Sequence, residues 1–125
     1  MNRSLRRYVL PLFLFLAWTP AVATDGTQLL QDCQDAEQFD ERKPVRNPFG
    51  IGRCFGFLEG VSGTMESVNS LLPSSLRTCF PEPRLATIQA VRIVLKFLRE
   101  NPEQHHEAAA YLIALAYRRA FPCKQ

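Results

Sequence analysis

Hydrophobic residues after position 24 recur with the 3.6-residue spacing of helices. The first apolar stripe follows Asp25 and Gln28, which fit a capping box. Its members are Leu29, Leu30, Cys33, Ala36 and Phe39. The charged segment 40–46 breaks the pattern and predicts a loop. Asn47-Pro48 then fits the cap and first position of a second helix, which the pattern extends to about Ser70.

The second half of the chain predicts two more helices after a proline-rich segment. Residues 71–84 contain three prolines, which favour an ordered loop. The third helix has one apolar face, formed by Leu85, Ile88, Val91, Val94, Leu95 and Leu98. Residues 101–104 (NPEQ) predict the end of this helix and the cap of a fourth one, which ends at Arg118 and Arg119. No segment alternates as a strand would, so the pattern predicts a compact all-α domain of four helices in two hairpins.

The N-terminal residues predict a secretory signal peptide. Three arginines precede an apolar run over 8–18, and Ala21-Val22-Ala23 fits a cleavage site after Ala23. The run is too short to span a bilayer, although a retained anchor helix is the alternative. Cys33 lies ten residues beyond the cut, so no cysteine is placed to carry a lipid. We therefore expect a signal peptide over 1–23 and one exported domain over 24–125.

Cleavage would change the charge of the protein. The whole chain carries 15 Lys and Arg against 12 Asp and Glu, a net charge of +3. Because Arg3, Arg6 and Arg7 leave with the signal, residues 24–125 keep 12 of each sign. This balance argues against a nucleic-acid partner and against membrane binding after cleavage.

The four cysteines predict a disulfide scaffold. An even number of cysteines in an exported domain of about 100 residues is typical of such scaffolds. No two cysteines are closer than 21 residues, which disfavours a zinc site. Since the cysteines flank the two hairpin turns at similar distances, we expect the pairs Cys33–Cys54 and Cys79–Cys123. Crossed pairing between the hairpins is the alternative.

Three glycines lie four residues apart within the second predicted helix, at positions Gly52, Gly56 and Gly60. Glycine destabilises a helix by about 1 kcal/mol relative to alanine, so its repetition calls for a packing reason. The spacing predicts a groove in which another helix of the same chain packs closely. A groove that receives a partner protein is the alternative.

The residues that could carry catalysis do not form a recognisable active site. His105 and His106 fall in the expected first turn of the fourth helix, and oxidised cysteines leave them no thiol to activate. Glu59 and Glu66 share a face of the second helix, as the carboxylates of a glycosidase might. Solvated helix surfaces explain both pairs better. The sequence therefore predicts a protein that is not an enzyme and that has no metal or cofactor.

Four segments resemble the Tai-type immunity proteins, which protect bacteria against amidase effectors of type VI secretion. These segments are 54–60 (CFGFLEG), 78–82 (TCFPE), 94–102 (VLKFLRENP) and 114–123 (ALAYRRAFPC). The resemblance covers nearly all of residues 24–125, whereas the charged loop 40–46 and Gly63 are atypical.

The resemblance implies a periplasmic, all-helical and often dimeric protein that binds a secreted peptidoglycan amidase. Inhibition would be steric, because loops would enter the amidase cleft without chemistry of their own. Two alternatives are an orphan periplasmic binding or structural protein and a stress chaperone, neither with a toxin partner. Only two histidines are available to trigger a chaperone at low pH, which argues against the latter.

The two long loops are the expected contact regions for a partner, because binding residues concentrate on loops that a rigid scaffold holds. The loop 40–48 carries a basic tip, formed by Arg42, Lys43 and Arg46. The loop 71–84 carries a mixed patch, formed by Arg77, Glu82 and Arg84. Charges that only solubilise these loops are the alternative.

Overall fold

The structure, a computed structural model, describes residues 23–124, so the predicted signal peptide lies almost wholly outside the described residues. Its helices are α2 (Gly26–Asp40), α3 (Pro48–Val68), α4 (Thr87–Glu100) and α5 (Ala109–Ala120), with short 3₁₀ turns η1 (Asn69–Leu71), η2 (Ser74–Leu76) and η3 (Pro102–Gln104). Over this range the chain forms no strand, only two isolated bridges. None of the helices in residues 23–124 combines the length and the apolar composition needed to cross a membrane. The prediction of an all-α domain with four helices is confirmed.

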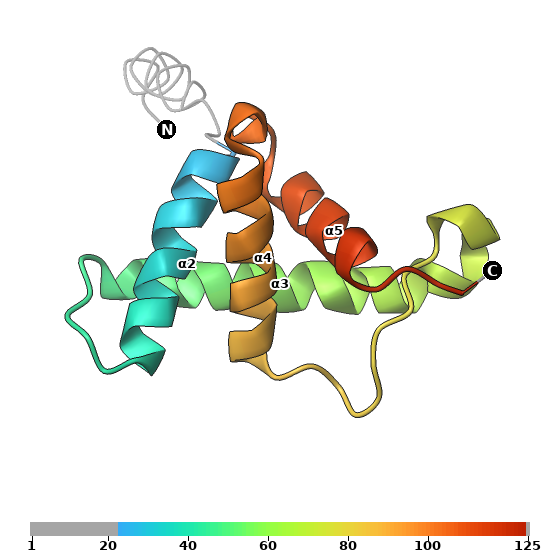
Figure 1. Cartoon of the computed structure of the whole chain (residues 1–125), viewed down its shortest axis with the longest axis horizontal. Helices are drawn as coiled ribbons and strands as arrows, with labels where there is room; N and C mark the ends of the chain where they lie inside the picture. The colour runs from blue at the N-terminus through green and yellow to red at the C-terminus, as the bar shows by residue number, and fades with distance from the viewer. Residues whose placement is uncertain (1–22, 125) are drawn as a thin grey trace, which may run out of the picture.

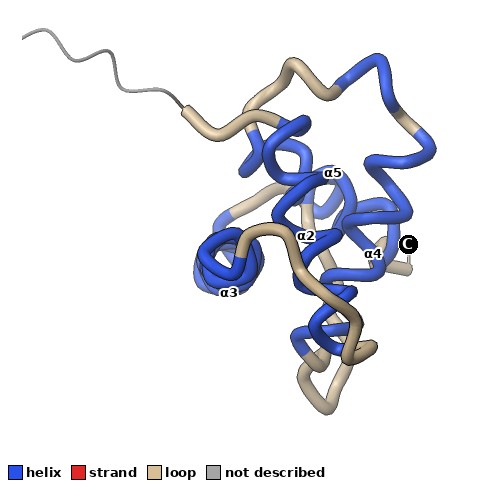
Figure 2. Tube along the Cα trace, turned by 90° about the vertical axis from the view of Figure 1, so that its left-hand side faces the viewer, coloured by secondary structure: helices blue, strands red, loops and turns tan. Residues whose placement is uncertain are grey.

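The long helix α3 lies on one side of the other three helices, which pack across it (Figures 1 and 2). The core fills the space between these two layers and includes residues from all four helices. Its fully buried members include Leu29, Cys33, Ala36, Cys54, Val91, Val94, Leu95, Leu112 and Ile113. The apolar face predicted for the third helix therefore points inward as expected, while its charged residues point outward.

Side-chain caps begin α2 and α3 as the sequence predicts. The Gln28 N–H donates to Asp25 Oδ1 at 2.9 Å, and the Phe49 N–H donates to Asn47 Oδ1 at 3.2 Å. The capping box at α2 is only half formed, since the Gln28 side chain donates to Asp32 instead. The residues next to each helix start in the sequence therefore determine where α2 and α3 begin.

The expected start of the fourth helix is wrong. Residues 101–108 form a connection, so His105 and His106 precede α5 instead of lying in its first turn. The backbone of this connection caps α2: the Gly26 N–H donates to the Glu107 carbonyl at 3.0 Å and the Thr27 N–H to the His105 carbonyl at 3.2 Å. First-turn amides have no acceptor within their own helix. The contact of residues 105–107 with the start of α2 thus takes precedence over the sequence signal for a helix at 101–104.

Each disulfide closes one pair of helices, with the expected partners. Cys33 of α2 is bonded to Cys54 of α3, and both residues are completely buried. Cys79, which precedes α4, is bonded to Cys123, which follows α5. The closed loops span 21 and 44 residues. In the chain-entropy model, such loops contribute about 3 and about 4 kcal/mol to stability.

The prediction that another helix packs on the glycine stripe is wrong. Gly52, Gly56 and Gly60 are exposed, and a Cβ atom added to any of them would meet nothing within 4 Å. The apolar residues of α3 that are buried, such as Leu58, face the opposite side of the helix. The glycines therefore lie on an open, outer side of α3. Figure 2 shows α3 end-on, with the other three helices on one side of it.

The two kinds of glycine should respond oppositely to alanine. Gly52→Ala should raise the free energy of unfolding by about 0.5–1 kcal/mol, since the site is open and alanine favours helix. Gly26→Ala should lower it by about 1–3 kcal/mol, because the new Cβ would lie 2.9 Å from the His105 Cα. Urea unfolding followed by circular dichroism measures both. A destabilised Gly52→Ala variant would show that this face is covered.

Candidate functional site

The two loops expected to bind a partner lie at opposite ends of α3 (Figure 1). This helix has 21 residues and is therefore about 30 Å long. The six charged residues predicted to contact a partner thus do not form one patch. Each loop has to be considered as a separate surface.

In the first loop, two of the three predicted cations already have partners within the protein. The buried Asp35 carboxylate accepts the backbone N–H of Arg46 at 3.0 Å and its Nε–H at 3.4 Å. Lys43 Nζ lies 2.6 Å from Glu41, and this hydrogen bond raises the pKa of Lys43. Most of the expected basic tip is therefore neutralised locally.

Arg42 is the exception in this loop. It has φ 57° and stands at the left-handed position of a Schellman motif that ends α2. The Lys43 N–H donates to the Gln38 carbonyl at 2.8 Å, and the Arg42 N–H donates to the Phe39 carbonyl at 3.0 Å. Glycine favours this position, and a side chain there costs about 1 kcal/mol. Arg42 is exposed and has no ion pair within residues 23–124.

The second loop is fixed to the helices at residues 78 and 79. The Cys79–Cys123 disulfide is reinforced by a hydrogen bond of 2.9 Å from the Cys79 N–H to the Phe121 carbonyl. The Asn69 side chain clamps Thr78 with two hydrogen bonds of 3.0 Å, one to its carbonyl and one from its N–H. This segment is therefore a rigid extension of the domain.

Arg77 organises the tip of the same loop. Its Nε–H donates to the Leu72 carbonyl at 2.8 Å, and its Nη2 donates to the Ser70 carbonyl at 3.3 Å. The guanidinium thus bridges the turns η1 and η2. Because these bonds hold the arginine in place, little side-chain entropy is left to lose on binding.

The structure separates Arg77 from the other two charges of the predicted mixed patch. Arg84 pairs with Glu66 of α3, and both line one hollow together with Glu82. Arg77 instead lies with Arg118 and Arg119 of α5 around a separate hollow. The mixed patch is therefore two surfaces of different charge, one on each side of the loop.

A second hollow, also lined by Arg84, contains Glu59 and Glu66, the two residues of the alternative glycosidase pair. Its volume is about 190 Å³, and Leu58, Phe80 and Tyr117 form much of its wall. Burial raises the pKa of Tyr117, and the charge of Glu59 adds to the effect. Glu66 is paired with Arg84, while Glu59 accepts from the Thr87 hydroxyl at 3.5 Å. Since both glutamates are exposed, the solvated-face interpretation fits them.

Comparison with protein families places the chain. A family model described as Rap1a immunity proteins matches residues 25–123. The chain belongs to this family. No curated protein and no solved structure matched the chain in the other two comparisons. It is thus an immunity protein by family, in agreement with the immunity function that the resemblance implied.

Immunity proteins bind, so the exposed apolar side chains of this Rap1a family member are informative. Leu71 is 81 % exposed and Leu76 is 43 % exposed, both in the second loop. At the other end of the molecule, Phe39 and Phe49 are 60 % and 73 % exposed. Exposed apolar residues on a rigid loop are typical of protein-binding anchors.

The sequence offered signals for some of these residues. Leu71 and Leu76 stand in a segment rich in proline and serine, where a leucine has no helical stripe to join. The position of Arg118 and Arg119 beside Arg77 had no local signal, because a disulfide and the fold of residues 78–123 bring them together. Among residues 23–124, no cluster of three metal-ligating side chains occurs.

Asp35 should contribute more to the stability of the domain than the exposed ion pairs do. Asp35→Ala should lower the free energy of unfolding by about 1–3 kcal/mol, because the Arg46 N–H would lose its acceptor. Asp40→Ala removes only an exposed pair with Arg92 and should change it by less than about 1 kcal/mol. Thermal unfolding of both variants makes the comparison. Equal effects would mean that Asp35 does not hold the loop.

Proposed function

We propose that this protein is a periplasmic immunity protein that binds and sterically blocks a peptidoglycan amidase effector of type VI secretion. Membership of the Rap1a immunity family supports binding of a cognate effector. The resemblance of four segments to Tai-type proteins supports an amidase as that effector. Two disulfides fit an oxidising compartment, where an effector that attacks the cell wall would act.

This proposal rests mainly on how the second loop is anchored and on what it exposes. A disulfide and the Asn69 clamp hold it on the helical layers, while Leu71 projects almost fully into solvent. A rigid loop with an exposed apolar tip fits a concave cleft, because little conformational entropy is lost when it enters. In this mechanism the loop occupies the substrate cleft of the amidase and excludes the peptide crosslink.

The first loop is a second contact region in our proposal, with Arg42 as its main charge. The chain retains an arginine where the Schellman motif favours glycine, at an expected cost in stability. A strained residue that stays exposed is a reasonable candidate for a functional role. Lys43 and Arg46 would contribute less, because Glu41 and Asp35 already bind them.

A second copy of the chain is the partner that we assign to the outer side of α3. An apolar groove between α3 and α5 borders this side, and it is lined by Gly56, Phe57, Gly60, Val61, Thr64, Met65, Ala110 and Ala114. The glycines would let two α3 helices approach closely. Homodimerisation is also what the resemblance implies.

The dimer proposal predicts a change of mass in solution. The wild-type protein should sediment as a dimer, and Gly60→Arg should sediment as a folded monomer, because the new side chain would fill the groove. Sedimentation velocity at several concentrations measures this. A monomeric wild type would remove the second copy from the account.

Inhibition of the effector tests the main proposal. The neighbouring gene should encode a small amidase, and an equimolar amount of this protein should abolish its release of peptides from peptidoglycan. Leu71→Glu should weaken the complex by about 2 kcal/mol or more in calorimetry, since it places a charge at the apolar tip. An unrelated metabolic neighbour would favour the orphan or chaperone alternatives.

Phe39→Glu makes the same kind of change beside the first loop, at the other end of the molecule. We expect a smaller loss of affinity than in Leu71→Glu, because the first loop is the second contact region in our proposal. A larger loss in Phe39→Glu than in Leu71→Glu would make the first loop the main contact.

A further inference from the structure

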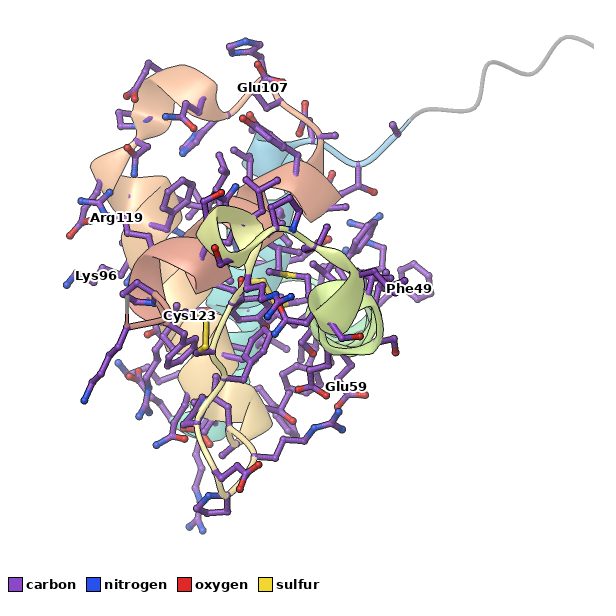
Figure 3. The ribbon with its side chains drawn as sticks, turned by 90° about the vertical axis from the view of Figure 1, so that its right-hand side faces the viewer. Phe49, Glu59, Lys96, Glu107, Arg119 and Cys123 are labelled. Atoms are coloured by element: carbon purple, nitrogen blue, oxygen red, sulfur yellow. A yellow bond between two sulfur atoms is a disulfide. The ribbon has the colours of Figure 1, made fainter. Side chains whose placement is uncertain are left out.

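Three arginines surround one hollow on the far side of the second loop. Arg77 comes from the loop, and Arg118 and Arg119 come from the last turn of α5. The hollow has a volume of about 560 Å³, and none of the residues that line it is an aspartate or a glutamate. Figure 3 shows this side of the molecule, with Arg119 and Cys123 labelled. We call this feature the arginine hollow.

The guanidinium groups of the arginine hollow retain most of their hydrogen-bonding capacity. An arginine has five N–H donors. Arg77 directs its Nε–H and Nη2 to backbone carbonyls, so further donors remain. Arg118 Nη2 donates to the Ser75 carbonyl at 3.5 Å. Arg119 forms an exposed ion pair with Glu100 at 3.7 Å, a separation too long for a hydrogen bond. The three guanidinium groups therefore have contacts that orient them, and each keeps N–H donors that a ligand could use.

Electrostatics favour an anionic occupant. Like charges around one hollow repel one another, and the carbonyls at the end of α5 offset only part of this repulsion. The Cys79–Cys123 disulfide keeps the loop that carries Arg77 next to the end of α5, and Cys123 itself lines the hollow. An anion that accepts hydrogen bonds from two or three arginines would remove the repulsion. The concentration of positive charge is notable in a domain with 12 residues of each sign.

We propose that the arginine hollow binds side-chain carboxylates of the effector, from an acidic segment beside its cleft. This inference rests on the proposed function. Guanidinium groups match carboxylates in a two-pronged geometry. Phe97 and Leu115 add apolar wall to the hollow, which suits the methylene groups of glutamate and aspartate better than a bare phosphate. The overall charge balance of residues 24–125 disfavours a nucleic acid.

The first test uses a probe that does not depend on the effector. Acetylated triglutamate amide is titrated into the ¹⁵N-labelled protein, and the arginine Nε–H signals are followed by NMR. Saturable shifts at Arg77, Arg118 and Arg119 are expected, with much smaller shifts from inorganic phosphate at the same ionic strength. No shift, or equal shifts with phosphate, would overturn carboxylate recognition at this hollow.

The second test measures affinity for the neighbouring amidase. The variant with Arg118→Gln and Arg119→Gln should bind at least tenfold more weakly and show a smaller salt dependence. Both residues are exposed on α5, so the variant should fold. The matched control has Arg92→Gln and Arg99→Gln, two arginines of α4 that pair with α2, and should bind like the wild type.

The outcomes separate the inference from the proposed function. If the wild type binds and inhibits the amidase but the α5 variant binds equally well, the arginine hollow is not part of the interface and the inference fails. If the wild type does not bind the amidase, the proposed function fails, and so does the identity of the partner named here. The triglutamate titration would then decide alone whether the hollow recognises carboxylates.

Discussion

The bond between Cys33 and Cys54 fixes how α2 lies on α3, and the rest of the domain is arranged around it. Both cysteines are fully buried, and a residue beside each one forms an ion pair. Asp32, which precedes Cys33, accepts two hydrogen bonds of 2.8 and 2.9 Å from Arg53, which precedes Cys54. Asp32 is almost fully buried, and its two hydrogen bonds from Arg53 offset part of the cost of burying its charge. The helix α3 can then serve as the base on which α4 and α5 pack.

A rigid base would let the loops carry the proposed function. The second loop has little regular structure, and its turns η1 and η2 are only three residues each. The disulfide to Cys123 and the Asn69 clamp replace the packing that such a segment lacks. The loop therefore presents apolar and charged groups in a fixed arrangement, which is what a steric inhibitor needs. Its charges differ on its two sides, so it can discriminate between partners.

Helical periodicity and caps predicted the helices well, because both are local signals. The starts of α2 and α3 at Asp25 and Asn47 and the inward face of α4 follow directly from the sequence. The start of α5 did not, since the backbone at His105 and Glu107 serves as a cap for α2, a contact between residues about 80 positions apart. The glycine stripe was misassigned because spacing shows that a face is smooth but not what covers it. The grouping of Arg77 with Arg118 and Arg119 likewise required the three-dimensional structure.

Our central proposal is that this member of the Rap1a family protects a cell from an amidase in an oxidising compartment. The most direct measurement is the survival of cells that export the neighbouring amidase to their periplasm while producing this protein. We expect survival with the full chain and lysis with a chain that lacks residues 2–23 and stays in the cytosol. Lysis in the presence of the full chain, or equal protection by the truncated chain, would contradict the account.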